Sequence, residues 1–485
     1  MQLSASSFYT LHAPSKCELR VFLRAHREPE AEPSPFDKLI EELGRRHEKE
    51  HLSQFKECVD LSDGGFDERI EKTAETIRRG ADVIYQGVLR SSLPGRAVEV
   101  VGVPDFLIRV GATYKVRDCK LARKVAEDHH VEVLRQLELY GWLYEQTTGK
   151  PPAGLEILLG DRSLMQLPYS GAGAALLELD FIYAMSNQAA EPYSPVGWSK
   201  CGGCGFHDRC WKRAEDQQDV ALVFDLDQGT ALQLHAEGIT TISDLLKSHT
   251  EETLAEFKRP YGRRMQKVGK NAKRILLQAT AMVSKTDQLI APPALPKSEN
   301  LVMFDLEGLP PQLDELDKVY LWGTQVYGKN PGKYFPALAG FGSDGDREGW
   351  LQFLQNCRSI FDMHGDIPFI HWAHYETTKV KSYIQRFGDV DGIGERVLKN
   401  CVDLLKITRD SLVISDYSYS LKVIEKHAGF ERGMDEYGGN WSIVQYIRAV
   451  ETEDPELRER IMSEILTYNE EDLQATWVVF QWLRK

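Results

Sequence analysis

The sequence contains no long hydrophobic run: within its 485 residues, no apolar stretch approaches the about 20 residues that a membrane-spanning helix needs. Its first residues lack the apolar core of a secretory signal peptide. The motif G-x4-G-K-[ST], with which P-loop motors hold nucleotide phosphates, is also missing. We therefore expect a cytoplasmic protein without a membrane anchor and without a nucleotide-driven motor of the usual type in this chain.

Positive charge is also scarce. The chain has 59 Lys and Arg against 73 Asp and Glu, which gives a formal net charge of -14. Such a protein does not coat a polyanion by its bulk charge, so any contact with nucleic acid must come from local basic patches. The length favours two to four domains.

The eight cysteines do not form a disulfide framework in a reducing compartment. Three of them crowd into the segment CGGCGFHDRC, with the spacing C-x2-C-x5-C, and this spacing indicates a metal site. The three are Cys201, Cys204 and Cys210, and Cys17 stands alone near the N-terminus.

A hairpin is predicted for VEVVGVPDFLIRVGATYKVRDCK, residues 98–120, with one strand to Val110, a turn at Gly111 and a returning strand. Asp118 and Lys120 are two residues apart, so they project from one face, and the hairpin can bring Asp105 beside them. Two carboxylates and a lysine can hold Mg²⁺ or Mn²⁺ and aim a water at a phosphate. The alternative is a surface hairpin with a salt bridge.

Two predicted helices flank this hairpin. The charged helix before it carries His47, which is either a solvated side chain or an additional metal ligand if the helix packs across the mouth of the hairpin. The helix after it carries Gln136 and Tyr140, which are four residues apart and so share one face.

In this order, the motifs resemble the RecB-type branch of the PD-(D/E)xK nucleases. The matching segments are His47, G-V-P-D at Gly102 to Asp105, D-C-K at Asp118 to Lys120, and Q-L-E-L-Y at Gln136 to Tyr140. The resemblance implies that His47, Asp105 and Asp118 bind metal and that Lys120 orients or activates the water. It further implies that Gln136 and Tyr140 contact the nucleic acid strand.

The split cysteine arrangement resembles the iron–sulphur staple of RecB-type nucleases. The resemblance implies a [4Fe–4S] cluster on Cys17, Cys201, Cys204 and Cys210 that clips the two ends of the domain together. Four thiolates also suit a structural zinc ion, and His207 offers a substitute ligand.

The segment 216–285 is predicted to be a helical connector. Its G-I-T-T step, Gly238 to Thr241, resembles helix-hairpin-helix modules, which grip the phosphate backbone. The following FKRPYGRRMQKVGKNAKRILL contains no acid and is either a basic footprint for a phosphodiester strand or a solvated helix face. We expect nucleic acid contacts from Arg263, Arg264, Lys267 and Lys270. A linker rich in proline follows, residues 286–299.

A second set of acidic residues lies beyond the linker. Asp305 and Glu307 follow a buried-looking strand and share one face, whereas Tyr468 and Asp472 are four apart on the last predicted helix. Glu376 lies at a strand-to-helix junction in HWAHYE. Carboxylates from such elements can converge on two metal ions, as in-line phosphoryl displacement requires; the alternative is scattered surface acids.

This segment resembles the DEDD exonucleases of the ribonuclease-H-like fold. D-L-E at Asp305 to Glu307 matches the first motif, and Tyr468-x3-Asp472 matches the tyrosine form of the last, in which the tyrosine helps place the attacking water. The middle motif departs, because Glu376 stands where the family has an aspartate. Asp403 is the alternative ligand.

Together these observations predict an α/β multidomain protein. Its parts are a restriction-endonuclease-like core with four cysteines (1–215), a helix-hairpin-helix-like connector (216–285), the linker, and an RNase-H-like domain (300–485). The predicted function is metal-dependent cleavage of DNA at single-stranded ends, in repair, recombination or defence. A helicase on another chain is the predicted partner. The alternatives are an RNA-processing nuclease, a single active domain beside a nucleic-acid-binding platform, and a binding protein without nuclease activity.

Overall fold

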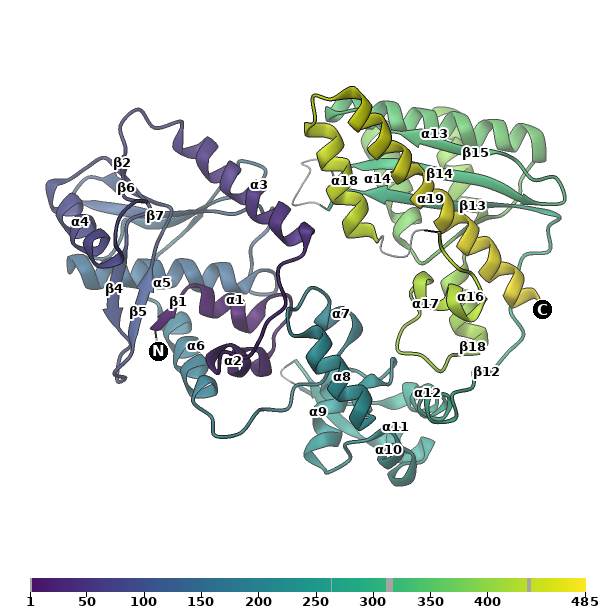
Figure 1. The fold of residues 1–485 in the computed structure, drawn as a ribbon, viewed down its shortest axis with the longest axis horizontal. Helices are drawn as coiled ribbons and strands as arrows, with labels where there is room; N and C mark the ends of the chain where they lie inside the picture. Colours follow the sequence, from purple (N-terminus) through teal and green to yellow (C-terminus); the bar gives the residue numbers. More distant parts are fainter. Residues whose placement is uncertain (1, 263, 311–316, 434–437) are drawn as a thin grey trace. The chain divides into compact units, whose positions relative to one another are not determined.

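The computed structural model describes residues 2–262, 264–310, 317–433 and 438–485 (Figure 1). These residues divide into two compact units, the first running to Lys212 and the second beginning at Arg213. None of the described helices is both long enough and apolar enough to cross a lipid bilayer.

The larger sheet of the first unit is mixed and contains the predicted hairpin. Gly111, with φ +62°, makes the turn, and Phe106 pairs with Arg117 across it. This register places Asp105 opposite Asp118. The strand order is β2 (Val59–Asp60), β3 (Val83–Tyr85), β6 (Phe106–Val110), β7 (Thr113–Cys119), β8 (Gly154–Leu158) and β9 (Leu164–Leu167).

The single outgoing strand predicted for residues 98–110 is wrong in one respect, because the structure splits it into two strands. Its first half is β5 (Glu99–Gly102), which lies in a separate sheet between β1 (Gln2–Ser4) and β4 (Leu89–Ser92), whereas its second half is β6. The break falls at Val103–Asp105, where Pro104 has no N–H to donate to a ladder.

The helix α5 (Val131–Thr148) packs on the sheet of the hairpin. Val116 of β7 and Leu137 of α5 belong to one core cluster. Because alternate residues of a strand share a face, Asp118 lies on the same face as Val116. The other helices of this unit are α1 (Ser6–His12), α2 (Glu18–Ala25), α3 (Pro35–Leu52), α4 (Phe66–Arg79), α6 (Gly173–Ser186), α7 (Trp198–Cys201) and α8 (His207–Gln217).

The second unit begins with the end of α8 and a small helical part. The helices α9 (Gln228–Ala236) and α10 (Ile242–Ser248) flank the predicted G-I-T-T step, in which Gly238 has φ +82°. The basic stretch that follows is not helical throughout, because Lys258–Lys267 forms a two-stranded hairpin. The hairpin consists of β10 (Lys258–Tyr261) and β11 (Arg264–Lys267), and it lies in the chain between α11 (Glu251–Glu256) and α12 (Ala272–Ser284).

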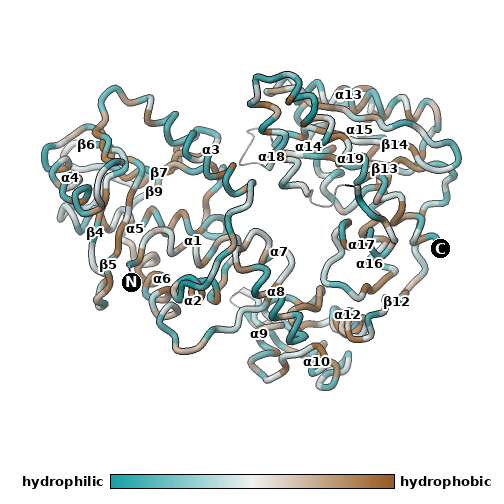
Figure 2. Tube along the Cα trace, in the orientation of Figure 1, coloured by the Kyte–Doolittle hydropathy of each residue, from teal (hydrophilic) through white to brown (hydrophobic). Residues whose placement is uncertain are grey.

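The remaining chain of the second unit builds a five-stranded sheet. β13, β14 and β15 are antiparallel neighbours, whereas β16 and β17 run parallel to β13. In sheet order the strands are β15 (Tyr334–Leu338), β14 (Val319–Gly328), β13 (Asn300–Gly308), β16 (Phe369–His371) and β17 (Cys401–Asp403). The apolar residues of β13 and β14 appear brown in Figure 2.

Both faces of this sheet are covered, which explains where the acidic residues of β13 lie. Val302 and Phe304 pack in one core with α13 (Gly342–His364) and α14 (Tyr375–Phe387). Leu301 and Met303 pack in another core with α19 (Pro455–Arg484). Because alternate residues of a strand share a face, Asp305 and Glu307 lie on the same face as Leu301 and Met303, the face that α19 covers (Figure 1).

Candidate active sites

The first candidate site lies where β6 and β7 meet. Asp105 and Asp118 are buried, with 9% and 2% of their surfaces exposed. The Asp105 carboxylate accepts a hydrogen bond of 2.7 Å from the backbone N–H of Cys119. Lys120 Nζ lies 2.6 Å from Asp118 Oδ2. The structure thus brings the predicted aspartates and lysine together.

The electrostatics of this cluster favour bound cations. Burial, with the neighbouring Asp118 charge, raises the pKa of Asp105 well above its usual range. Burial alone would lower the pKa of Lys120, but the Asp118 carboxylate and other neighbours raise it overall, so the ammonium stays charged. A divalent cation would relieve the repulsion between the two buried carboxylates.

The helix α3 contributes His47 and Glu48 to this region. Gln86 Nε2 donates to Glu48 Oε1 at 2.5 Å and to Asp105 Oδ1 at 3.0 Å, so Glu48 is joined to the cluster through Gln86. His47 Nε2 lies 3.4 Å from the Leu158 carbonyl oxygen, at the end of β8. Glu48 and Gln86 were not predicted as site residues, because only the tertiary packing of α3 brings them here.

The helix α5 presents the two predicted strand-contacting residues. Gln136 Nε2 donates to the Tyr140 hydroxyl at 2.7 Å, and the hydroxyl of Tyr9 donates to Gln136 Oε1 at 2.9 Å. Gly102 of the G-V-P-D motif permits this packing, since a Cβ there would lie 2.7 Å from a ring carbon of Tyr140. Tyr9, which the sequence analysis missed, also has Lys120 Nζ 5.8 Å from its ring centre.

The four predicted cluster cysteines line one pocket of the first unit: Cys17, Cys201, Cys204 and Cys210. Arg20 and His207 line it as well. The Arg20 Nε and Nη1 atoms are buried and have no hydrogen-bond partner among the described residues. Arg20 Nη2 lies 3.6 Å from Glu30 Oε1, so Nε and Nη1 are the atoms left to face the four sulfurs, and they suit a group that carries negative charge.

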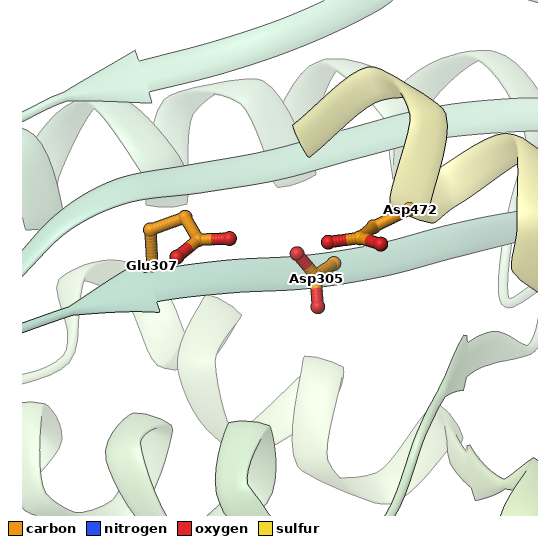
Figure 3. A group of neighbouring side chains, drawn as sticks. All are labelled: Asp305, Glu307 and Asp472. Carbon is orange, nitrogen blue, oxygen red and sulfur yellow. The ribbon is translucent and has the colours of Figure 1, made fainter. Parts of the chain in front are cut away.

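The second candidate site contains three carboxylates from two elements. Figure 3 shows Asp305 and Glu307 on β13 and Asp472 on α19, with their side chains directed toward one another. One ligand atom of each residue lies within 4.8 Å of the other two. Among the described residues, this is the one such group of three acidic, histidine or cysteine side chains.

Burial and mutual repulsion strain this group electrostatically. Burial raises the pKa of Asp305 well above its usual range, with added repulsion from Asp472 and Glu307. The same two causes, burial and then the Asp472 charge, raise the pKa of Glu307 to about 8. Burial also raises the pKa of Asp472, although Arg432 opposes this. Divalent cations are the natural counter-charge for such a set.

Two polar side chains fix the carboxylates in place. Asn469 Nδ2 donates to Asp305 Oδ2 at 2.7 Å, and Asn469 Oδ1 accepts a hydrogen bond of 2.8 Å from the Tyr334 hydroxyl. A guanidinium N–H of Arg432 donates to Asp472 Oδ1 at 2.5 Å, and the same side chain makes two bonds of 2.7 Å to Glu425. Neither Asn469 nor Arg432 was predicted, because each contact joins segments distant in sequence.

The other predicted residues of this site lie around the three carboxylates. Glu376, at the start of α14, is buried near His371, whose Nδ1 is 3.5 Å from Glu376 Oε2, and it lies outside the group of three. Tyr468 is buried one turn before Asp472 on α19. Asp403, on β17, accepts a hydrogen bond from the backbone N–H of Lys406 and so caps a helix, α16 (Leu404–Ser411).

The predicted basic residues lie on and beside the hairpin β10–β11. Arg264 and Lys270 are exposed, and Lys267 forms an ion pair with Glu256. Arg263 lies outside the described residues.

Comparison with known proteins identifies both domains. Residues 7–211 match the family model described as the PD-(D/E)XK nuclease superfamily, and residues 302–484 match the RNase_H superfamily. The chain is a fusion of these two kinds of domain, which confirms the predicted α/β multidomain fold and indicates a metal-dependent nuclease that binds nucleic acid.

No curated protein matches the chain. Among solved structures, one titled "Crystal structure of SSO0001" has 18% identity, with 36% of this chain and 96% of that chain covered and a TM-score of 0.20.

Proposed function

We propose that this protein is a metal-dependent exonuclease that hydrolyses single-stranded DNA at two separate sites. The observation that carries the proposal is the convergence of Asp305, Glu307 and Asp472, one half-buried and two buried carboxylates with ligand atoms within 4.8 Å of one another. The family match over residues 302–484 supports the same chemistry.

At the second site, Asp305, Glu307 and Asp472 would hold Mg²⁺ or Mn²⁺. Carboxylate oxygens suit both ions, and the raised pKa values of Asp305 and Glu307 support cation binding, because a bound cation would stabilise their ionised forms. Bound ions would activate the attacking water and stabilise the charge on the transferring phosphate.

The chain's own residues have distinct roles around that group. Asn469 and Arg432 orient the Asp305 and Asp472 carboxylates through the hydrogen bonds described above. We assign the Tyr468 hydroxyl to positioning the attacking water, since burial keeps its pKa raised and the hydroxyl protonated. Glu376 would act as the further carboxylate beside Asp305, whose pKa its charge helps to raise.

At the first site, we assign metal binding to Asp105, Asp118 and His47. Lys120, which keeps its charge beside Asp118, would orient the water. Gln136 and Tyr140 would contact the DNA strand from α5, and Tyr9 would hold Gln136 in position.

The four cysteines would hold a [4Fe–4S] cluster with a structural role. The pocket contains four sulfur donors, and the Nε and Nη1 atoms of Arg20, which have no hydrogen-bond partner in the described part of the chain, suit an anionic cluster there. Anaerobically purified protein should be brown, with a broad visible absorption that dithionite bleaches. A colourless protein that contains zinc would contradict this assignment.

End-labelled single-stranded DNA and RNA distinguish these possibilities directly. We expect cleavage of DNA in Mg²⁺ or Mn²⁺ by the native chain. Lys120→Ala and Asp472→Ala should each remove a different part of the product ladder, and the double variant should be inert. Lys150→Ala and Asp362→Asn replace exposed residues of the same charges and serve as matched controls.

The other outcomes are equally clear. If Lys120→Ala alone removes all cleavage, the second domain is a binding platform and the proposal of two sites is wrong. If the protein cleaves RNA in preference to DNA, the substrate is RNA and the proposal of DNA is wrong. We also propose that a helicase on another chain supplies the single strand; recovery of the protein from cells without such a partner would count against it.

A further inference from the structure

The hairpin β10–β11 is anchored firmly at its base. Arg259 is 8% exposed, and its Nε lies 2.7 Å from Asp227 Oδ2, at the start of α9. The hairpin backbone also approaches α9 closely, since a Cβ at Gly229 would lie 2.2 Å from the Pro260 carbonyl oxygen. The hairpin is therefore held by its first strand while its end projects into solvent.

That projecting end carries large apolar side chains. Tyr261 is 65% exposed and Met265 is 57% exposed. The Arg259 guanidinium lies 4.9 Å from the centre of the Tyr261 ring. Because cation–π contact of this kind holds a ring in one orientation, Tyr261 is positioned although most of its surface remains open.

The pairing register places further polar groups beside this ring. Tyr261 pairs with Arg264, and Arg259 pairs with Gln266, so these four side chains share one face of the hairpin. No acidic residue occurs between Lys258 and Arg274, in a protein whose net charge is -14. The face thus combines an open aromatic ring with local positive charge.

This combination fits one class of ligand. Nucleobases stack on exposed aromatic rings irrespective of sequence, and basic side chains neutralise the phosphates between them. An acidic protein surface would satisfy the charges but would not require a fixed, open ring. Double-stranded nucleic acid would offer phosphates, but its bases are already stacked.

We propose that one face of the paired strands β10 and β11, the face that carries Tyr261 and Arg264, is a stacking platform for single-stranded nucleic acid. A base stacks on Tyr261, while Arg264, on the same face, and Lys270, beside the hairpin, contact neighbouring phosphates. The inference rests on the proposed function and deepens it, because it names a binding surface outside both groups of carboxylates.

The test measures binding without cleavage. Fluorescein-labelled 30-nucleotide oligo(dT) is titrated with the full-length protein in the absence of divalent metal. Tyr261→Leu should weaken binding on the order of tenfold, whereas Tyr261→Phe should bind as the native protein does. Phe341→Leu, which changes another exposed aromatic residue of the second unit, should also have no effect.

A second readout reports on stacking itself. A strand that contains 2-aminopurine should lose fluorescence on binding to the native protein and to Tyr261→Phe, but much less with Tyr261→Leu at saturation. A strand of abasic sites should bind native protein and Tyr261→Leu equally, because it has no base to stack.

The outcomes separate this inference from the proposed function. If the native protein binds oligo(dT) and Tyr261→Leu binds it equally well, the stacking platform is wrong and the nuclease proposal stands. If the native protein binds no single strand but captures an acidic protein or duplex DNA, both are wrong. Both are supported if Asp472→Ala loses its part of the product ladder but binds oligo(dT) as the native protein does, while Tyr261→Leu binds it more weakly.

Discussion

At the scale of single residues, the second site is a set of buried charges that compensate one another. Arg432 bonds to both Asp472 and Glu425, and all three side chains are largely buried. Such a cation keeps Asp472 oriented, although an ion pair of this kind adds little net stability. Asp305 has an amide partner instead, and Glu307 lies 3.4 Å from the Tyr320 hydroxyl. The site thus leaves Asp305 and Glu307 short of positive charge.

The first prediction concerns the proton on Glu307. Its pKa of about 8 means that the carboxyl is mostly protonated at pH 7 when no metal is bound. Binding of Mn²⁺ requires ionised carboxylates, so affinity should rise at least tenfold per pH unit between pH 6 and pH 8, since the pKa of Asp305 is raised as well. Calorimetry in buffers of different ionisation enthalpy measures the protons released. Glu307→Gln should release about one fewer than the native protein.

Glu395→Gln is the matched control, because it makes the same substitution at an exposed position on α15 (Ile393–Asn400), away from the three carboxylates. Equal proton release from the native protein and Glu307→Gln would show that Glu307 is already ionised without metal.

The second prediction concerns Arg20. If the cysteine pocket holds an iron–sulphur cluster, the guanidinium stabilises the reduced form, which carries one more negative charge than the oxidised form. Arg20→Gln should lower the reduction potential on the order of tens of millivolts. Arg27→Gln is the control, because it removes the same charge at an exposed position just beyond α2. A potentiometric titration that finds the same potential in native protein and Arg20→Gln would contradict this role.

At the scale of elements, local periodicity predicted much of the fold. Alternation along β13 placed Asp305 and Glu307 on one face, and the turn at Gly111 fixed the pairing that sets Asp105 opposite Asp118. These features depend on neighbours within a few residues. The partners of the carboxylates do not: Asn469 and Asp305 are 164 residues apart.

The split of residues 98–110 into two strands shows the same limit. The apolar pattern is continuous across the break, so periodicity favoured one strand. Pro104 indicated an interruption, but the pairing of β5 with β1 depends on residues at the N-terminus. The hairpin within the basic connector likewise contains Pro260 and Gly262, which disfavour a helix, although the stretch was predicted as part of a helical segment.

The third prediction tests how β14 supports the second site. Gly323 pairs with Asp305, and a Cβ there would lie 1.8 Å from Asn469 Oδ1. Gly323→Ala should displace Asn469, release Asp305 and lower the stability of the fold by about 1–3 kcal/mol. The products that depend on Asp472 should diminish, whereas those that depend on Lys120 should remain.

Gly439→Ala is the matched control, since nothing lies within 4 Å of the added Cβ. Denaturant unfolding measures the stability of both variants. Native stability and native product ladders for Gly323→Ala would show that Asn469 is free to move without consequence.

At the scale of the whole molecule, the net charge has the same sign as the proposed substrate. A net charge of -14 repels a polyanion at long range, and both candidate sites are themselves rich in carboxylates. Binding must then depend on a few local contacts rather than on the overall field. The basic residues of the connector are the candidates for those contacts. Their contribution to binding affinity can be measured separately from the contribution of net charge.

The last prediction separates local from overall charge by salt titration. Each phosphate contact to a single strand contributes about 0.7 to the slope of log K against log salt concentration. Arg264→Gln and Lys270→Gln should each reduce the slope by about 0.7 and weaken binding. Lys381→Gln lowers the net charge by the same amount at an exposed position outside the connector, on α14. It should leave the slope unchanged, because a charge that contacts no phosphate releases no counterion. Equal changes for all three variants would show that the overall field, not the connector, controls binding.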